Sequence, residues 1–234
     1  MEQPAASHIL QIAIDGPVGS GKSDISERLA RALGLTYLNT GAMYRAFALA
    51  CVRAGVGWKD TPRALVLLRD TGIELTKPDE DSTRPFRILL NGEDVTEKLF
   101  TPEMDSGSSD VGTVQAVREH MVERQQELAA GKSVVMEGRD IALRVLPHAQ
   151  FKIYLTAAIE ERAKRRFLQF QKKGMEKSFA EVLEDTKTRD IQDTTRPNDP
   201  LTVLADHWVL DTTGLPQEEV VRKIKDELVR RNLI

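Results

Sequence analysis

The chain has few of the features typical of secreted, membrane or nucleic-acid-binding proteins. Cys51 is its only cysteine, so no internal disulfide can form and we expect a reducing compartment. Its four histidines are scattered without the spacing of metal ligands. No apolar run is long enough to cross a membrane and residues 1–7 lack the form of a signal peptide, so we expect a cytoplasmic protein with no membrane partner. The net charge of −3 offers no basic field for nucleic acid.

The length and composition are those of an ordinary globular protein. The 234 residues are 41% hydrophobic and 29% charged, which suits one α/β domain with an insertion or two small domains. Cys51 lies in an apolar helical run, so we expect it in the core.

The most informative motif occupies residues 16–23. Its residues Gly16, Pro17, Val18, Gly19, Ser20, Gly21, Lys22 and Ser23 satisfy the P-loop pattern. An apolar, β-branched segment over 9–15 precedes the motif and an amphipathic helix over 24–33 follows it, whereas an ordinary glycine-rich turn requires neither. The glycines allow positive φ and bring backbone N–H groups to an anion. We therefore expect ATP phosphates here, with Lys22 on the β- and γ-phosphates and Ser23 holding Mg²⁺, directly or through water.

Strands separated by helices predict an α/β fold with a five-stranded parallel sheet. The expected strands are residues 9–15, 36–39, 133–137, 151–156 and 208–211. The expected helices are residues 24–33, 42–54, 61–69, 102–128, 159–171 and 216–231, and the helix over 102–128 is expected to break near Gly107 or Gly112. A further helix is expected to begin at a capping box from Ser178 to Glu181. A small β region interrupts this order, with strands over 72–76 and 86–90, a polar loop over 77–85, a hairpin turn at Asn91-Gly92 and a helical turn over 95–100. We therefore expect residues 72–118 to form an inserted subdomain in a core made of residues 9–71 and 119–234.

Charged side chains follow the second and third strands of the core, where a ligand of a parallel sheet binds. Arg45 is suited to a substrate phosphate with Tyr44 beside it, or else Thr40 caps a helix and Tyr44 fills the core. The segment Glu137-Gly138-Arg139-Asp140 suits a carboxylate near Mg²⁺ and an arginine on a substrate phosphate, or else it forms a local ion pair at the strand end.

A second group of basic residues surrounds Gly174. Arg162, Lys164, Arg165 and Arg166 crowd one helical turn, and Arg189 and Arg196 follow farther along. This group is either a solvated face or a lid, over about 162–196, that brings arginines to a transferring phosphoryl group.

These motifs together resemble the bacterial cytidylate kinases, in the nucleoside monophosphate kinase group. The matching segments are residues 12–17, 40–45, 90–96, 137–141, 160–163, 193–196 and 210–215, which run in order over nearly the whole chain. The stretch Asn91-Gly92-Glu93-Asp94-Val95-Thr96 is the most specific, because it belongs to the large monophosphate-binding insertion of that family.

The resemblance implies transfer of the γ-phosphoryl group of ATP to CMP or dCMP. It also implies a P-loop core with a monophosphate-binding insertion and a lid. We expect the protein to be a monomer. By position, the resemblance implies that the acceptor nucleotide is held by Thr40, Tyr44, Arg45, Arg139 and Asp140. It implies that the cytosine or the phosphate of this nucleotide is surrounded by Ser109, Arg118, Asp193 and Arg196. It also implies three lid arginines that act in catalysis with Lys22, namely Arg162, Arg166 and Arg189.

The chain departs from the family at several positions. Asp24 stands where the family has threonine, Asn39 stands where it has aspartate, and residues 142–148 and 197–200 also differ. An acid beside phosphates is unfavourable, so Asp24 is expected to weaken donor binding. Two other functions remain open: a P-loop kinase with another small acceptor, and a catalytically weak nucleotide-binding regulatory protein.

Overall fold

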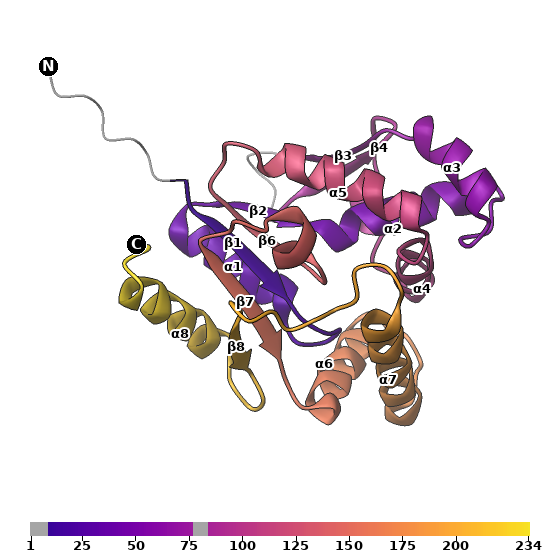
Figure 1. The fold of residues 1–234 in the computed structure, drawn as a ribbon. Helices are drawn as coiled ribbons and strands as arrows, with labels where there is room; N and C mark the ends of the chain where they lie inside the picture. The colour runs from indigo at the N-terminus through magenta and orange to yellow at the C-terminus, as the bar shows by residue number, and fades with distance from the viewer. Residues whose placement is uncertain (1–8, 77–83) are drawn as a thin grey trace, which may run out of the picture.

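A five-stranded parallel sheet forms the centre of the protein, as the sequence predicts (Figure 1). The computed structural model describes residues 9–76 and 84–234, so most of the predicted loop 77–85 lies outside the described residues. The strands are β1 (Gln11–Asp15), β2 (Thr36–Asn39), β6 (Val134–Gly138), β7 (Phe151–Thr156) and β8 (Trp208–Asp211), in the spatial order β2-β6-β1-β7-β8. The strand that leads into the P-loop is therefore central, and the segments after β2 and β6 emerge at the same edge of the sheet.

Helices cover this sheet and extend beyond it. They are α1 (Lys22–Leu33), α2 (Thr40–Arg53), α3 (Thr61–Arg69), α4 (Pro102–Val111), α5 (Gln115–Ala129), α6 (Ile159–Lys172), α7 (Phe179–Thr195) and α8 (Gln217–Arg230), with a π-helical turn η2 (Ile141–Val145) after β6. Helix α1 packs on β1, β2 and β6 and against α8. Helices α6 and α7 pack on each other at the lower right of Figure 1, beyond the carboxyl edge of the sheet.

Side-chain caps explain where two of the helices begin. Helix α2 starts at Thr40, two residues before the predicted start, because the Asn39 side chain accepts a hydrogen bond from the Ala42 N–H. The interpretation of Thr40 as the cap is therefore wrong. Helix α7 begins with the predicted capping box, in which Ser178 and Glu181 bond reciprocally. The helix predicted over residues 102–128 is broken at Gly112, where α4 ends.

The predicted small β region is an antiparallel sheet of β3 (Ile73–Thr76), β4 (Arg87–Leu90) and β5 (Glu93–Asp94), followed by the short 3₁₀ turn η1 (Thr96–Lys98). Asn91 and Gly92 make the predicted turn between β4 and β5, with φ of 50° and 82°. This sheet and α3 lie at the upper right of Figure 1.

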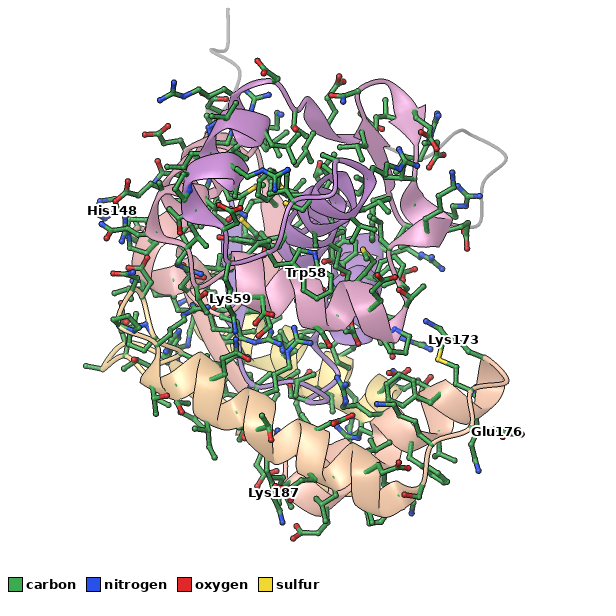
Figure 2. All side chains as sticks on the ribbon, turned by 90° about the vertical axis from the view of Figure 1, so that its right-hand side faces the viewer. Trp58, Lys59, His148, Lys173, Glu176 and Lys187 are labelled. Atoms are coloured by element: carbon green, nitrogen blue, oxygen red, sulfur yellow. The ribbon has the colours of Figure 1, made fainter. Side chains whose placement is uncertain are left out.

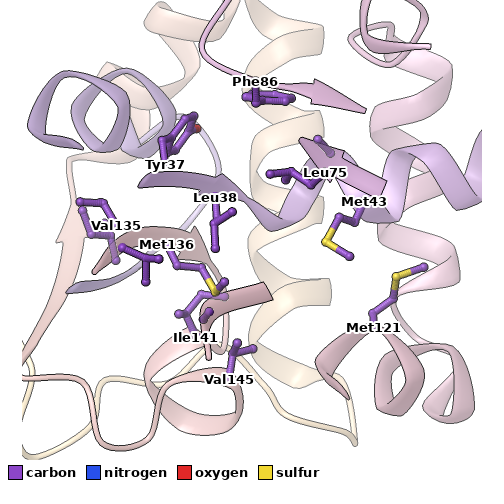
Figure 3. Close-up of a cluster of buried hydrophobic side chains, with 14 of the residues drawn as sticks. Tyr37, Leu38, Met43, Leu75, Phe86, Met121, Val135, Met136, Ile141 and Val145 are labelled. Carbon is purple, nitrogen blue, oxygen red and sulfur yellow. The ribbon is translucent and has the colours of Figure 1, made fainter. Parts of the chain in front are cut away.

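One apolar core joins the small sheet to the central one (Figure 3). Met43 on α2 is 1% exposed, and Leu38 of β2 and Leu75 of β3 belong to the same buried cluster. The Phe86 ring packs edge-on against Tyr37, with ring centroids 5.8 Å apart. Cys51 is fully buried in this core, as expected. Among the described residues, no helix is long and apolar enough to span a bilayer.

Candidate active site

A cleft of about 420 Å³ opens at the carboxyl edge of the central sheet. Most of the predicted site residues line it: Val18, Gly19, Gly21, Lys22, Ser23, Asp24, Thr40, Tyr44, Arg45, Ser109, Arg118, Arg139, Asp140, Arg166, Arg189, Asp193 and Arg196. The predicted residues that are described but do not line it are Gly16, Pro17, Ser20 and Arg162. The fold thus gathers residues that are as far apart in the chain as 18 and 196.

The P-loop requires glycine at two positions because other parts of the chain come close. A Cβ on Gly16 would lie 2.0 Å from the Leu155 carbonyl oxygen of β7, and one on Gly19 would lie 2.7 Å from the Arg162 carbonyl oxygen of α6. Gly19 and Gly21 also have φ of 76° and 91°, as predicted. The loop therefore packs closely between β7 and α6.

Lys22 is folded into the P-loop. Its side chain is buried, and its Nζ donates hydrogen bonds to the Pro17 carbonyl at 2.8 Å and to the Ser20 hydroxyl at 3.4 Å. Burial and the nearby Arg139 cation lower the pKa of Lys22 well below its usual value, against the opposing effect of Glu137. The lysine therefore lacks a full counter-charge, which bound phosphates would supply.

The residues near Ser23 fit a magnesium ion that is held mainly by nucleotide phosphates. Glu137 at the end of β6 lines the same cleft as Ser23, and its Oε1 accepts a hydrogen bond from the Tyr37 hydroxyl at 2.8 Å. Asp15 is not available, because its two carboxylate oxygens accept hydrogen bonds from the backbone of Ile141 and Ala142. Among the described residues, no group of three or more histidine, cysteine or acidic side chains forms a cage for a metal. Mg²⁺ commonly takes only one or two protein oxygens, together with phosphates and water.

Arg118 and Asp140 form a buried ion pair at one end of the cleft. Arg118 is 2% exposed and donates to Asp140, to the Gly112 carbonyl at 3.2 Å and to Asp199 at 3.3 Å. Burial raises the pKa of Asp140 in spite of the Arg118 charge, and Arg196 lies 3.7 Å from the same carboxylate. This end of the cleft therefore offers a carboxylate and guanidinium groups in a dry setting.

Tyr44 packs beside this pair. Its ring centroid is 5.9 Å from the Arg118 guanidinium carbon, and its buried hydroxyl has no hydrogen-bond partner in the described structure. Burial raises the pKa of Tyr44 to about 12, so the phenol stays protonated and can donate to a ligand.

Asp193 belongs to a different pair. Its carboxylate accepts a hydrogen bond from Arg139 Nε at 2.7 Å. Although burial opposes it, the charges of Arg139 and Arg189 lower the pKa of Asp193. All four residues of the predicted set Ser109, Arg118, Asp193 and Arg196 line the cleft, but their ion pairs differ, because Asp193 pairs with Arg139 whereas Arg118 pairs with Asp140 and Asp199.

Three arginines meet around Asp105, a residue that the sequence analysis missed. Arg45 donates to Asp105 Oδ1 from Nε at 3.1 Å and from Nη2 at 2.7 Å. Arg166 lies 3.8 Å from Oδ2, and Arg189 donates to the Asp105 carbonyl at 3.1 Å. The sequence held one signal for it: Asp105 lies four residues before Ser109 on α4, and therefore on the same face of the helix.

Arg162 is not brought to the cleft. Its guanidinium donates to both carboxylate oxygens of Asp190, at 3.0 and 2.6 Å, and to the carbonyls of Val18 and Ala157. These contacts tie the P-loop to α6 and α7, which is a bracing role.

Two charged residues stand at the rim. Asp24 is exposed, and its Oδ2 accepts a hydrogen bond from Gln217 Nε2 at 2.8 Å, so the carboxylate is tied to the start of α8. Lys173, labelled in Figure 2 where α6 ends, donates to the Phe100 carbonyl at 2.8 Å across the cleft. Sequence reasoning had no signal for this second contact.

A P-loop on the central strand of a parallel sheet, opening into a cleft with several arginines, defines the class of P-loop kinases. The family model for cytidylate kinase matches residues 12–230, and the chain belongs to this family. It is 44% identical over 223 residues to a cytidylate kinase of Caldanaerobacter subterraneus subsp. tengcongensis, covering 95% of this chain and 96% of that one. It is 45% identical to a cytidylate kinase of Caldicellulosiruptor bescii, covering 92% and 93%.

Among solved structures, an uncharacterized protein from Eubacterium ventriosum superposes with a TM-score of 0.51 at 10% identity, covering 94% of this chain and 98% of that one, and it shows the fold alone. The predicted family and fold class are confirmed.

Proposed function

We propose that the protein is a cytidylate kinase that transfers the γ-phosphoryl group of ATP to CMP or dCMP, giving ADP and CDP or dCDP. One observation carries the proposal: a single cleft contains the P-loop with Lys22, a group of arginines, and the buried Arg118–Asp140 pair. Membership of the cytidylate kinase family over residues 12–230 supports it.

The donor phosphates lie on the P-loop N–H groups and Lys22, at the start of α1. Ser23 and Glu137 would hold Mg²⁺, which when bound neutralises phosphate charge. Lys22 then gains the anionic partners that it lacks in the free protein, and its ammonium stabilises charge on the transferring group.

The acceptor phosphate lies between Arg45 and Arg139, and Arg166 and Arg189 neutralise the equatorial oxygens of the transferring group. The Nε atoms of Arg166 and Arg189 are buried without a hydrogen-bond partner in the described structure, so both have donors to spare for an anion. No general base is needed, because the acceptor phosphate is already anionic. Arg162, whose donors are taken up by Asp190 and backbone carbonyls, holds these elements together.

Recognition of the base rests on Arg118 and Asp140, with Ser109 and Arg196 beside them and Asp193 farther along. Cytosine has an amino donor at N4 and acceptors at N3 and O2, so a carboxylate and a guanidinium pair with it. Uracil has an acceptor at O4, which would face a carboxylate, and each such mismatch of buried groups costs about 1–3 kcal/mol.

The test is an ADP-release assay with CMP, dCMP, UMP, AMP and GMP as acceptors. CMP and dCMP should exceed UMP in kcat/KM by about tenfold or more. Asp140→Asn should reduce this preference and leave the KM for ATP unchanged, and Asp193→Asn is its matched comparison. A higher kcat/KM for UMP or AMP would contradict the proposed acceptor, and ATP binding without turnover on any acceptor would favour a regulatory role.

We assign residues 72–118 to the acceptor-binding insertion, because α4 belongs to this segment and lines the cleft. We assign residues 162–196 to the lid, because residues of α6 and α7 in this segment also line the cleft. We place the protein in the cytoplasm, where its nucleotide substrates occur and its single thiol stays reduced.

A further inference from the structure

The carboxylate of Asp105 occupies the middle of the arginine group in the cleft. It projects from α4, and it takes both hydrogen bonds from one edge of Arg45, the Nε and Nη2 edge. The two side chains are only 18% and 22% exposed. Arg45 of α2 and Asp105 of α4 therefore form a partly buried ion pair, although they are 60 residues apart in the chain.

The same residue is approached by two of the three predicted lid arginines. Arg166 of α6 places Nη2 3.8 Å from the second oxygen of Asp105, and Arg189 of α7 donates to its backbone carbonyl. Burial lowers the pKa of Arg166, and it lowers that of Arg189 to about 10, so both cations lack full compensation. Asp193, which also faces Arg189, accepts its side-chain hydrogen bond from Arg139. Asp105 is therefore the acidic side chain that Arg45 and Arg166 share.

A phosphate group binds arginine best through two parallel N–H bonds. The Nε and Nη2 edge of Arg45 is such a pair of donors, and Asp105 already occupies it. A phosphate dianion and a carboxylate that compete for one edge also repel each other at short range. Binding of a phosphate to Arg45 thus requires Asp105 to give up these bonds.

We propose that Asp105 is a built-in counter-ion of the acceptor-phosphate site, which takes the place of the phosphate group in the free enzyme and is displaced when the acceptor binds. This inference rests on the proposed function, in which Arg45 holds the acceptor phosphate. While the site is free, Asp105 keeps α2, α4, α6 and α7 together. When the acceptor arrives, the carboxylate lowers its affinity.

The substitution Asp105→Asn keeps the size of the side chain and removes its charge. The expected result is a Kd for CMP lower by about tenfold or more, since one repulsion in a poorly solvated site is relieved. The Kd for cytidine, which lacks the phosphate, should change less than about twofold, since the base site is untouched. Isothermal titration calorimetry measures both. Asp110→Asn is the control for these two affinities, because Asp110 lies on the same helix and its partners are Lys59 at 3.1 Å and Gln192 at 3.5 Å rather than Arg45.

A second measurement concerns the ligand-free protein. Asp105→Asn should raise hydrogen exchange over residues 162–196 in the free enzyme, and this difference should vanish with ATP and CMP bound. If Asp105→Asn does not fold, Asp105→Ser serves in both experiments.

Two outcomes would overturn the counter-ion role: a Kd for CMP that is unchanged or raised, or an equal change for CMP and cytidine. Arg45→Ala separates this failure from that of the proposed function. A large loss of CMP affinity in Arg45→Ala with no change in Asp105→Asn removes only the counter-ion. Unchanged CMP affinity in Arg45→Ala removes the acceptor-phosphate site itself.

Discussion

At the scale of single residues, the burial of Lys22 makes the stability of the free protein depend on pH. The pKa of Lys22 is depressed by burial, so the folded protein holds the lysine proton less tightly than the unfolded chain does. Between the folded pKa and the unfolded value of about 10.4, the unfolded chain binds more protons, so stability rises with pH in that window.

Lys22→Met should abolish phosphoryl transfer, because the transition state loses a charge worth several kcal/mol. The variant should fold, and its stability should lack the rise with pH that wild-type Lys22 contributes below about pH 10.4. Urea unfolding at a series of pH values and the ADP-release assay measure these two effects. Near-normal turnover would show that this loop is not the donor site.

Asp24 is a second residue with a testable charge. We expect Asp24→Thr to lower the KM for ATP, most visibly at low Mg²⁺, because an acid in the first turn of α1 repels donor phosphates. Gln217→Ala is the complementary variant: it frees the carboxylate that Gln217 now binds, and should raise that KM. Equal KM values in all three proteins would mean that Asp24 remains outside the range of the phosphates.

At the scale of elements, α6 and α7 form the proposed lid. ATP with CMP should protect the backbone amides of residues 162–196 from hydrogen exchange more than ATP alone does, because the arginines of these helices meet the transferring group only when both substrates are present. Mass spectrometry after exchange gives the comparison. The same exchange in the free and doubly liganded protein would remove the case for a lid.

Variants of the Arg162–Asp190 pair test whether Arg162 stabilises the packing of these helices or acts on the substrate. Asp190→Ala should destabilise the protein by about 3 kcal/mol, since it leaves a buried guanidinium without its partner. The double variant Arg162→Met with Asp190→Leu should recover much of that loss. If Arg162 only braces, activity of the double variant follows its stability. Loss of turnover in a stable double variant would restore Arg162 to the catalytic set.

At the scale of the whole molecule, we expect a monomer. The most exposed large apolar side chains of the described residues belong to different helices, with Val66 on α3, Ile191 on α7 and Val229 on α8. No single one of these helices gathers them into an interface. Light scattering after size exclusion should give a mass near the 26.2 kDa of one chain. A mass of two chains at micromolar protein would contradict this expectation.

Much of the architecture could be predicted from the sequence because its causes are local. The strands over 36–39, 151–156 and 208–211 and the helix over 61–69 have the predicted bounds, since apolar patterning and turn residues lie within a few positions of them. The P-loop glycines and the turn at Asn91-Gly92 follow from the φ angles that those turns demand. The start of α2 was misjudged because a cap depends on which side chain reaches the N–H groups, and Asn39 does so.

Only the tertiary structure decided which charges meet. Arg162 and Asp190 are 28 residues apart, Arg45 and Asp105 are 60 apart, and Arg118 and Asp199 are 81 apart. No local periodicity encodes such pairs, because they depend on how β-strands and helices from distant segments are packed. The sequence by itself therefore determined the fold class, the family resemblance and the phosphate-binding loop. The packing of α4, α6 and α7 around the cleft determined that Asp140 rather than Asp193 pairs with Arg118, that Arg162 braces, and that Asp105 lies among the arginines.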